Sequence, residues 1–497
     1  MLRKRITALM LIAVMCCLPI FSAACSQSTQ ENEKSSNDGD SNIASEDNEV
    51  SEEDLKEQYK PDFGVVDMGG YVFKIGTRDD ATHIYPAHTR DLYAEAETGD
   101  IINDAVYKRN RTIEDKYNCI IEMVDYPEAD ETAANNIVAK SVKAGDYSFD
   151  LLMTHIIHGA SASANGYYHN IAVFPNIDLS KPYWNQGATD GLSVGGKLYV
   201  GLSDLSFSTN ENLYCIFFNK QLMKDFEIAD PYALVKENKW TFDKFNEIIR
   251  TATIDVDGDG AMTEADQYGY VTSNSMNFLW SGGSQIMSKD ADDMPYLNFM
   301  SEKTLAIFDK AFDITNNDYT FKDKEWFVET GIKIFENGRG LFYSSQLCRV
   351  NDLRATEFDF GIIPYPKFDS AQENYYSYVD GHASVMAIPQ CLPNPEYTGM
   401  IIEELSYESY KNILPVYYDV VLNVKMVRDE ESVDMLEILF DSKTFDFGYA
   451  YGSWDLWYLF LDCIHTNDRD FVSKYEKKVD AALKTIDKMV NAIIDLE

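Results

Sequence analysis

The chain has 497 residues, and its 82 acidic against 43 basic side chains give a formal net charge of -39 near neutral pH. This excess of negative charge repels phosphate backbones and anionic lipid headgroups, so it argues against binding nucleic acid or a membrane surface through a basic face. The length exceeds the roughly 100–200 residues of one ordinary domain, so we expect the folded body to form two lobes.

The N-terminal residues have the layout of a bacterial secretory signal. Basic residues at 3–5 precede an apolar run over 6–21, and three small residues lead to Cys25. This order predicts a signal peptide over 1–24 and lipid attachment at Cys25. Ser22 stands where a lipobox usually has Leu, so two alternatives stay open: ordinary cleavage that frees the protein, or retention of the apolar run as an anchor.

Residues 25–61 carry many Ser, Asn, Asp and Glu side chains and almost no apolar ones. Such a segment cannot bury enough apolar surface to offset the entropy lost on ordering its backbone. We therefore expect a lipid-anchored, disordered linker between the membrane and the folded body.

The first part of the body alternates strand and helix patterns. Strands are predicted over 71–76, 120–124 and 149–153, and helices from Thr98 and over 133–144. This alternation predicts an α/β lobe with a largely parallel sheet, in which ligands bind beyond the carboxyl ends of the strands. The loops expected at that place are 77–80 and 154–163.

Further strands and helices follow in the second part of the body. Residues 212–219 read as a strand that leads into a helix from Lys220, and Thr241 is a suitable N-cap for another helix. Later segments are a Gly/Ser-rich loop over 276–286, strands over 341–343, 360–364 and 384–389, and an amphipathic helix over 472–494.

In their order and spacing these segments resemble the extracellular solute-binding proteins of bacterial ABC importers, in the sugar-binding branch that includes maltose-binding protein. The stretches that carry the resemblance are the lipoprotein start, Gly196–Val200 leading to Phe218-Asn219-Lys220, Trp240–Asp243, Asn337–Phe342, Gly361–Pro366 and Ala387–Pro389.

The resemblance implies an α/β, two-lobed periplasmic-binding-protein-like fold of type II, with a ligand cleft between lobes that a multi-strand hinge joins. It places lobe 1 at 62–209 and 343–389, and lobe 2 at 210–342 and 390–497. Ligand contacts made by both lobes exist only when the lobes are closed, so ligand would shift the population towards closure.

The same resemblance implies a monomer that is not an enzyme and needs no cofactor. Its partners would be a small-molecule sugar, the transmembrane subunits of an ABC permease and, through the lipid anchor, the extracellular face of the cell membrane.

Sugars offer C–H faces to aromatic rings and hydroxyl groups to polar side chains, so both residue types are candidate contacts. The candidates that the family's pattern and the strand ends suggest are Asp80, His158, Asn212, Trp280, Ser345, Asp380 and Trp457. Each has a structural alternative: Trp280 could be a core residue, Trp454 competes with Trp457, and an isolated His is more often part of the scaffold.

Residues 255–266 form the most specific motif in the chain. Acids stand at positions 1, 3, 5 and 12 of a twelve-residue loop, and Gly260 stands at position 6, which is the spacing of an EF-hand calcium loop. The predicted ligands of a structural Ca²⁺ are Asp255, Asp257, Asp259, the carbonyl of Ala261, Thr263 and Asp266. Position 12 is Asp where EF-hands have Glu, and a solvated acidic turn is the alternative.

Two alternative functions remain at this point. A secreted glycoside hydrolase would also be acidic and rich in aromatic residues, but it needs two carboxylates facing each other across a cleft, which sequence positions cannot establish. A binding protein could instead carry peptides or other organic solutes.

Overall fold

The computed structural model describes residues 52–78, 90–126, 132–323, 330–420, 430–452 and 454–496. Residues 51–497 group into one compact unit. The predicted signal peptide and Cys25 therefore lie outside the described residues, as does Asp80. Among the helices that are described, none has the length and apolar character needed to cross a bilayer.

The first sheet has the strand order β12-β3-β1-β2. Strand β1 (Tyr71–Arg78) pairs in parallel with β2 (Cys119–Tyr126) and β3 (Leu151–His155), and β12 (Ser384–Ala387) runs antiparallel to β3. The predicted, largely parallel sheet is confirmed. In the first half of β2, buried Cys119 and Ile121 alternate with exposed Ile120 and Glu122, as expected for a strand with one face on a core.

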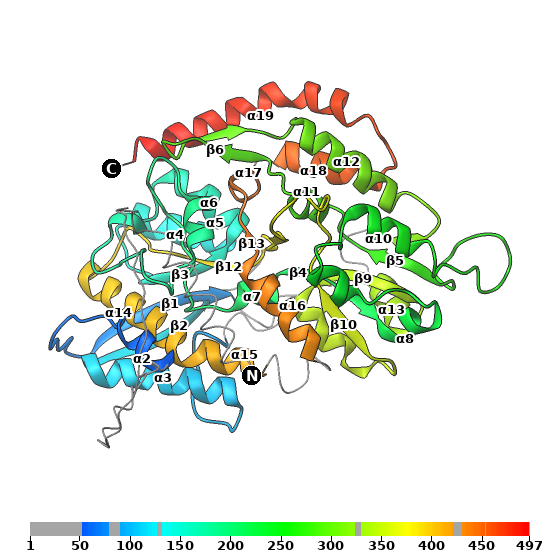
Figure 1. Cartoon of the computed structure of the whole chain (residues 1–497). Coiled ribbons are helices and arrows are strands. Elements are labelled where there is room, and N and C mark those ends of the chain that lie inside the picture. Colours follow the sequence, from blue (N-terminus) through cyan, green and yellow to red (C-terminus); the bar gives the residue numbers. More distant parts are fainter. Residues whose placement is uncertain are drawn as a thin grey trace, which may run out of the picture. The chain divides into compact units, whose positions relative to one another are not determined.

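Helices lie on both sides of this sheet (Figure 1). On one side are α3 (Ile101–Tyr117) and α14 (Pro395–Glu408), and on the other are α4 (Ala133–Ala144) and α5 (Ile156–Ala162). Helix α3 begins at Ile101, three residues after the predicted start, because the Asp100 carboxylate caps it by accepting hydrogen bonds from Ile102 N and Asn103 N. Shorter elements of this region are η1 (Ser163–Asn165), η2 (Ile171–Val173), α6 (Gln186–Leu192), α7 (Ser208–Glu211), the π-helical η4 (Ser409–Ile413) and α15 (Leu414–Val420).

The second sheet has the order β10-β4-β9-β5-β8. Strand β4 (Tyr214–Asn219) runs antiparallel to β10 (Phe360–Ile363) and β9 (Gly340–Gln346), and β5 (Tyr268–Thr272) runs parallel to β9 and β8 (Thr320–Lys322). The helices and the one 3₁₀ segment of this region are α8 (Lys220–Asp225), α9 (Pro231–Lys236), α10 (Phe242–Ile249), α11 (Asn277–Ser281), α12 (Glu302–Thr315), α13 (Thr330–Glu336), η3 (Leu347–Ala355) and α16 (Glu430–Asp441).

The core between β9, β5 and α10 is largely aromatic. Phe245 on α10 packs edge-on against Tyr270 and Phe342, with ring centroids 4.9 and 5.2 Å apart. Thr241 caps α10 by accepting a hydrogen bond from Lys244 N, as predicted. The apolar residues of this short helix therefore face the sheet and fix the helix on it.

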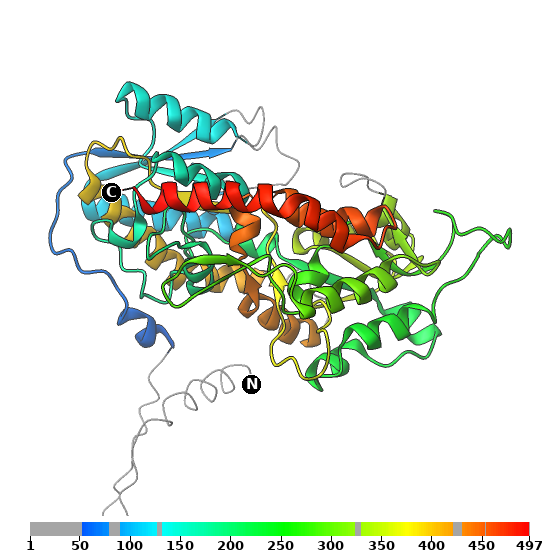
Figure 2. The same cartoon turned by 90° about the horizontal axis from the view of Figure 1, so that it is seen from above.

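Two small two-stranded sheets and three C-terminal helices complete the described part of the fold. Strands β6 (Met287–Lys289) and β7 (Pro295–Leu297) form a hairpin, and β11 (Ser377–Tyr378) pairs with β13 (Lys443–Thr444). The chain ends with α17 (Phe447–Ala450), α18 (Trp454–His465) and the predicted long helix, α19 (Phe471–Ile494). Seen from above, α19 extends along one face of the body (Figure 2).

The two sheets divide the chain at other residues than the predicted lobe boundaries. The prediction that 343–389 returns to lobe 1 is wrong for β10, because β10 pairs with β4 in the second sheet. The prediction that 390–497 belongs to lobe 2 is wrong for α14, η4 and α15, which contact α3 beside the first sheet. A strand pattern identifies a strand but not its partner, so residue 343 could not be recognised as lying within the second sheet.

The described end of the predicted linker is helical. Helix α2 (Glu52–Glu57) forms within that segment, so the expectation of an irregular chain is wrong there. Glu57 forms an ion pair with Lys411 of η4, and the Lys56 ammonium lies 5.1 Å from the Tyr410 ring centroid. These contacts give the helix a surface to pack on, which its own composition does not reveal.

Candidate functional site at the junction of the two sheets

Residues 377–384 connect the second sheet to the first. Val379 forms an isolated antiparallel bridge with Leu213, just before β4, and Asp380 N donates to Asn212 O at 3.0 Å. Four residues later the same chain enters β12 of the first sheet. This connecting segment is therefore the point at which side chains from both sheets can meet.

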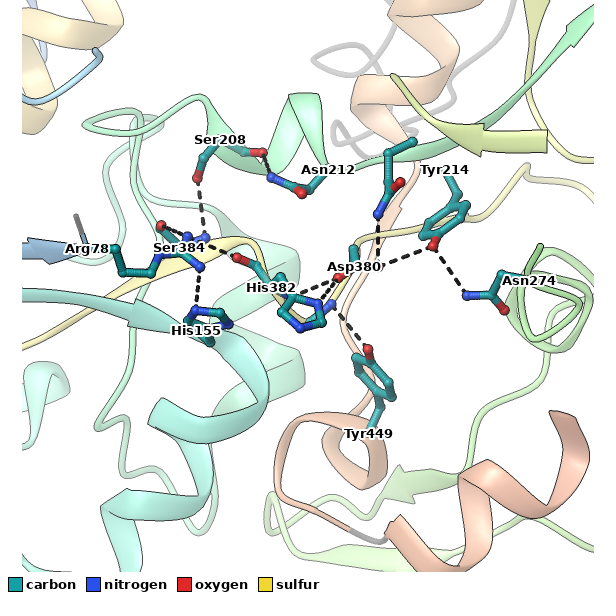
Figure 3. A network of polar contacts seen from close by, with 12 residues as sticks. Arg78, His155, Ser208, Asn212, Tyr214, Asn274, Asp380, His382, Ser384 and Tyr449 are labelled. Atoms are coloured by element: carbon teal, nitrogen blue, oxygen red, sulfur yellow. Dashed lines mark hydrogen bonds and ion pairs between the residues drawn. The ribbon is translucent and has the colours of Figure 1, made fainter. Parts of the chain in front are cut away.

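Asp380 is the centre of a buried polar network in that segment (Figure 3). Its Oδ1 accepts a hydrogen bond from His382 N at 2.9 Å and lies 2.7 Å from His382 Nδ1. Its Oδ2 accepts hydrogen bonds from Tyr214 OH on β4 and Gln346 Nε2 on β9, both at 3.2 Å. Burial raises the pKa of Asp380, but the charge and hydrogen bonds of His382 outweigh it and leave the pKa below its ordinary value.

Arg78 holds the other end of the segment from the first sheet. It is the last residue of β1 and is buried, and its Nη2 donates to His382 O at 3.1 Å and to Ser384 Oγ at 3.0 Å (Figure 3). Its Nη1 contacts Nε2 of His155, the last residue of β3. Because a guanidinium group can only donate, that histidine nitrogen must accept and is unprotonated. The connection is thus fixed to the second sheet at Asp380 and to the first sheet at 382–384.

An aromatic cluster lies directly beside Asp380. Tyr378 stacks on Trp280 with ring centroids 4.1 Å apart and an interplanar angle of 3°. Tyr214 also stacks on Tyr378, with ring centroids 5.4 Å apart. Tyr449 packs edge-on against Tyr378, and its hydroxyl accepts a hydrogen bond from Gly381 N at 3.2 Å (Figure 3). Trp457 in turn packs edge-on against Tyr449 at 5.2 Å. We refer to these five rings as the aromatic cluster.

A buried carboxylate fixes the indole of Trp280. Asp446 Oδ2 accepts hydrogen bonds from Trp280 Nε1 at 2.9 Å and from Ile286 N at 2.7 Å, and Oδ1 accepts one from Gly448 N at 2.8 Å. Burial raises the pKa of Asp446, although these hydrogen bonds partly oppose the shift. Asp446 therefore joins α17 to α11 and the base of the β6–β7 hairpin.

The structure gathers several predicted contacts at this junction. Asn212 and Asp380 are joined through the backbone, and Ser345 lies on β9 beside Gln346, where it pairs with Cys215. The Oδ1 atom of Asn212 is buried and has no hydrogen-bond partner among the described residues. The three polar candidates thus share one region, and their role as ligand contacts stays a prediction.

The other candidates have different surroundings. The expectation that Trp280 lies on an exposed loop is wrong: it is on α11, only 1% exposed, with one face covered by Tyr378. Trp457 is buried on α18, and His158 is half-buried on α5, within a segment predicted to be a loop. The Gly/Ser-rich sequence around Trp280 suggested exposure, but the hydrogen bond to Asp446 satisfies the indole N–H and allows burial.

The residues that sequence reasoning missed are those whose partners are remote in the chain. Arg78 and Asp446 contact groups that lie more than 150 residues away, at Ser384 and Trp280. Tyr378 and Tyr449 had no distinguishing signal among the 32 tyrosines of the chain. The one usable indication was that Arg78 falls in the loop 77–80, which was predicted to lie beyond the carboxyl end of the first strand.

Three of the predicted calcium ligands lie close together in the 255–266 loop. Ligand atoms of Asp255, Asp257 and Asp259 lie within 4.8 Å of one another. The Asp255 carboxylate accepts hydrogen bonds from Gly258 N at 2.7 Å and Gly260 N at 2.8 Å. Both glycines have positive φ, which an L side chain rarely adopts. The three acids therefore point their oxygens to one place.

Asp266, the predicted twelfth ligand, is placed differently. It is fully buried and accepts hydrogen bonds from Val256 N at 2.8 Å and from Thr263 N at 2.7 Å. Hydrogen bonds from these backbone groups hold its pKa below the ordinary value. Asp266 closes the loop in this arrangement, and it is not within the group formed by the other three acids.

Comparison with known proteins supports the fold. No family model and no curated protein matches the chain by sequence. Among solved structures, one similar to this chain is a cyclo/maltodextrin-binding protein complexed with maltotetraose, at 12% sequence identity and a TM-score of 0.55. The superposition covers 85% of this chain and 97% of that protein's chain. The ABC substrate-binding protein Lmo0181 from Listeria monocytogenes, in complex with cycloalternan, is 11% identical with 84% and 99% coverage and a TM-score of 0.53.

A third match agrees with these. The maltose/maltodextrin-binding domain MalE from Bdellovibrio bacteriovorus, bound to maltotriose, is 13% identical with 84% and 99% coverage and a TM-score of 0.51. At such low identity the similarity shows the fold alone. The chain has the mixed α/β fold with two main sheets that these ABC substrate-binding proteins share, which confirms the fold class predicted from the sequence.

Proposed function

We propose that this protein is an extracellular solute-binding protein that captures a carbohydrate, in particular an oligosaccharide, and delivers it to an ABC permease. The observation that carries the proposal is the fold similarity over 84–85% of this chain to substrate-binding proteins that were solved with maltotetraose and cycloalternan. The polar network around Asp380 adds a physical basis. It fixes the connecting segment 377–384 to both sheets, so a movement of one lobe relative to the other would pass through this segment.

The junction is suited to holding a solute rather than to acid catalysis. A glycosidase needs one carboxyl group whose raised pKa keeps it protonated near neutral pH. Asp380 has a lowered pKa, so it stays ionised and can only accept hydrogen bonds. Glu211 on α7 is one buried carboxyl group whose pKa is raised, to about 7, and it forms an ion pair with Arg90.

A thermal-shift screen tests the proposal. Malto-oligosaccharides, raffinose and cyclic glucans form the first panel, and peptides and amino acids form the second, because a ligand that binds only the folded state raises the unfolding temperature. Stabilisation by a member of the first panel, with the sugar recovered intact by chromatography, is the expected result. Stabilisation by peptides alone would favour a peptide-binding protein. Hydrolysis of the sugar by the wild type but not by Glu211→Gln would favour a glycoside hydrolase.

We also propose that Cys25 is the lipid-modified N-terminus that holds the protein at the extracellular face of the cell membrane. The signal layout over residues 1–24 supports this. In a bacterial host, the wild-type protein is expected in the membrane fraction and Cys25→Ser in the culture fluid or as an uncleaved precursor. Release of both proteins into the medium would show ordinary signal cleavage instead.

The 255–266 loop supports a third proposal, a structural Ca²⁺ bound by Asp255, Asp257 and Asp259. The EF-hand spacing and the close approach of these three carboxylates favour it. Millimolar Ca²⁺ is expected to raise the unfolding temperature of the wild type but not of Asp257→Ala, and Mg²⁺ is expected to have less effect. Equal responses of the two proteins would show that the loop is a solvated turn.

A further inference from the structure

The chain passes from the first sheet to the second through residues 202–213, which we call the first crossing. Before it, Gly201 exchanges two backbone hydrogen bonds of 2.9 Å with Met386 of β12. After it, β4 begins in the second sheet. The hydrogen bond from Asp380 N to Asn212 O joins the first crossing to the connecting segment of the junction. The position of the first crossing therefore affects how the two sheets meet.

One helical segment contacts the first crossing at two places. Helices α14, η4 and α15 follow one another without a break over residues 395–420. Ser406 Oγ on α14 lies 2.7 Å from Ser203 Oγ, and the Tyr417 ring on α15 stacks on Phe207 with ring centroids 4.3 Å apart. All four side chains are buried. Because close-packed side chains transmit a displacement, a shift of this helical segment would move the first crossing.

The π-helical η4 lies between these two contacts along the segment. A π-helical turn is rare and is frequently found at functional sites. On its inner side, Ser409 Oγ accepts a hydrogen bond at 2.9 Å from Nη1 of Arg109, a buried residue of α3. The neighbouring side chains of Tyr410 and Lys411 are half-buried. The contacts of these two side chains therefore help to decide where η4 lies.

The segment before the first strand is docked on η4. Glu57 of α2 forms an ion pair with Lys411, and the Lys56 ammonium lies 5.1 Å from the Tyr410 ring centroid. Further apolar side chains after α2 pack half-buried against the core, and they are Tyr59, Phe63 and Val66. We call residues 52–68 the strap.

The end of the strap is fixed to the end of α3. Met68 N donates a hydrogen bond to Tyr117 O at 2.8 Å, and Asn118 Nδ2 donates one to Asp67 Oδ1 at 2.7 Å. The strap is thus held at both ends, by η4 and by α3, which both lie beside the first sheet.

The strap also acts on the first crossing through charge. Burial raises the pKa of Asp204, which lies in the first crossing, and the positive charges of Lys443 and Lys56 oppose this rise. Lys56 of the strap is therefore close enough to the first crossing to act on it directly, in addition to the route through η4.

From these contacts we propose that the strap is a positioning element, which holds the helical segment 395–420 against the first crossing and loosens the crossing when it is released. Residues 25–51, the predicted linker, join the body at the strap. A force on the linker would therefore reach the junction of the two sheets by this route. This last step rests on the proposed lipid attachment at Cys25, whereas the action of the strap on the crossing does not.

Hydrogen–deuterium exchange of the purified full chain, measured by mass spectrometry without any solute, tests the proposal. Glu57→Lys places a positive charge opposite Lys411, and the double variant Glu57→Lys, Lys411→Glu restores an ion pair with its charges exchanged. The matched control is Lys310→Ala, which breaks the surface ion pair with Asp243.

The proposal predicts that Glu57→Lys exchanges faster than the wild type, by about threefold or more, in peptides that cover the strap, η4 and residues 203–213. The double variant should return to the rates of the wild type, and Lys310→Ala should not differ from it in these peptides. Faster exchange of the strap alone, equally faster exchange of the whole body, or no change in Glu57→Lys would each overturn the proposal. Because no solute is added, these outcomes are distinct from a failure of sugar binding.

Discussion

Replacing Asp380 by Asn is the most informative single perturbation of the junction. The variant keeps the shape of the side chain but turns one acceptor oxygen into an NH₂ group. Each carboxylate oxygen of Asp380 contacts two groups, so whichever oxygen the NH₂ group replaces, two groups lose their acceptor and meet a donor instead. Hydrogen bonds to a charged group contribute roughly 1.5–3 kcal/mol each, so we expect a loss of about 3 kcal/mol or more at pH 7.

The pH dependence of this loss gives an independent check. The pKa of Asp380 lies below its ordinary value of 3.8 in the folded state. Its contribution to stability is therefore complete above the unfolded-state pKa and is lost as the pH falls through the lowered folded-state pKa. The difference between wild type and Asp380→Asn should therefore narrow as the pH falls below about pH 4.

Urea unfolding followed by intrinsic fluorescence measures both quantities. Asp243→Asn is a suitable control, because the Asp243 side chain is 76% exposed and its ion pair with Lys310 lies at the surface. The control is expected to change stability by less than about 0.5 kcal/mol. A loss for Asp380→Asn that is no larger than the control's, or that grows as the pH falls, would refute the reasoning about this network.

Two further substitutions test the packing around the site. Asp446→Ala leaves Trp280 Nε1 and two or more backbone N–H groups without their acceptor, so urea unfolding should show a loss of about 3–5 kcal/mol; a loss under 1 kcal/mol would contradict the assigned hydrogen bonds. Gly269→Ala would place a Cβ on the carbonyl oxygen of Ile249, so we expect little soluble protein, whereas Gly187→Ala, with its nearest neighbour at 3.4 Å, should be well tolerated in the same expression assay.

The strand and helix patterns identified much of the fold. Helix α4 was predicted with its exact residues, and the cap of α10 was predicted at Thr241. These signals are local, because a capping side chain acts on the next few N–H groups. What the patterns could not show was the partner of each strand, and β10 was therefore assigned to the wrong sheet.

The site was predicted only in part, for the same physical reason. Asn212, Ser345 and Asp380 lie near strand ends or crossings, where the resemblance placed polar contacts, and the structure brings them together. The burial of Trp280 depends on Asp446, which is 166 positions away. No local pattern in the sequence indicates such a pairing. The Gly/Ser-rich segment around Trp280 was therefore predicted to be exposed.

Isothermal titration calorimetry of the folded body with maltotetraose and related oligosaccharides tests the central claim most directly. The account predicts saturable binding of one sugar molecule per protein, with the sugar intact after the titration. The absence of a heat of binding for every sugar in the panel, together with binding of a peptide or turnover of a glycan, would contradict it.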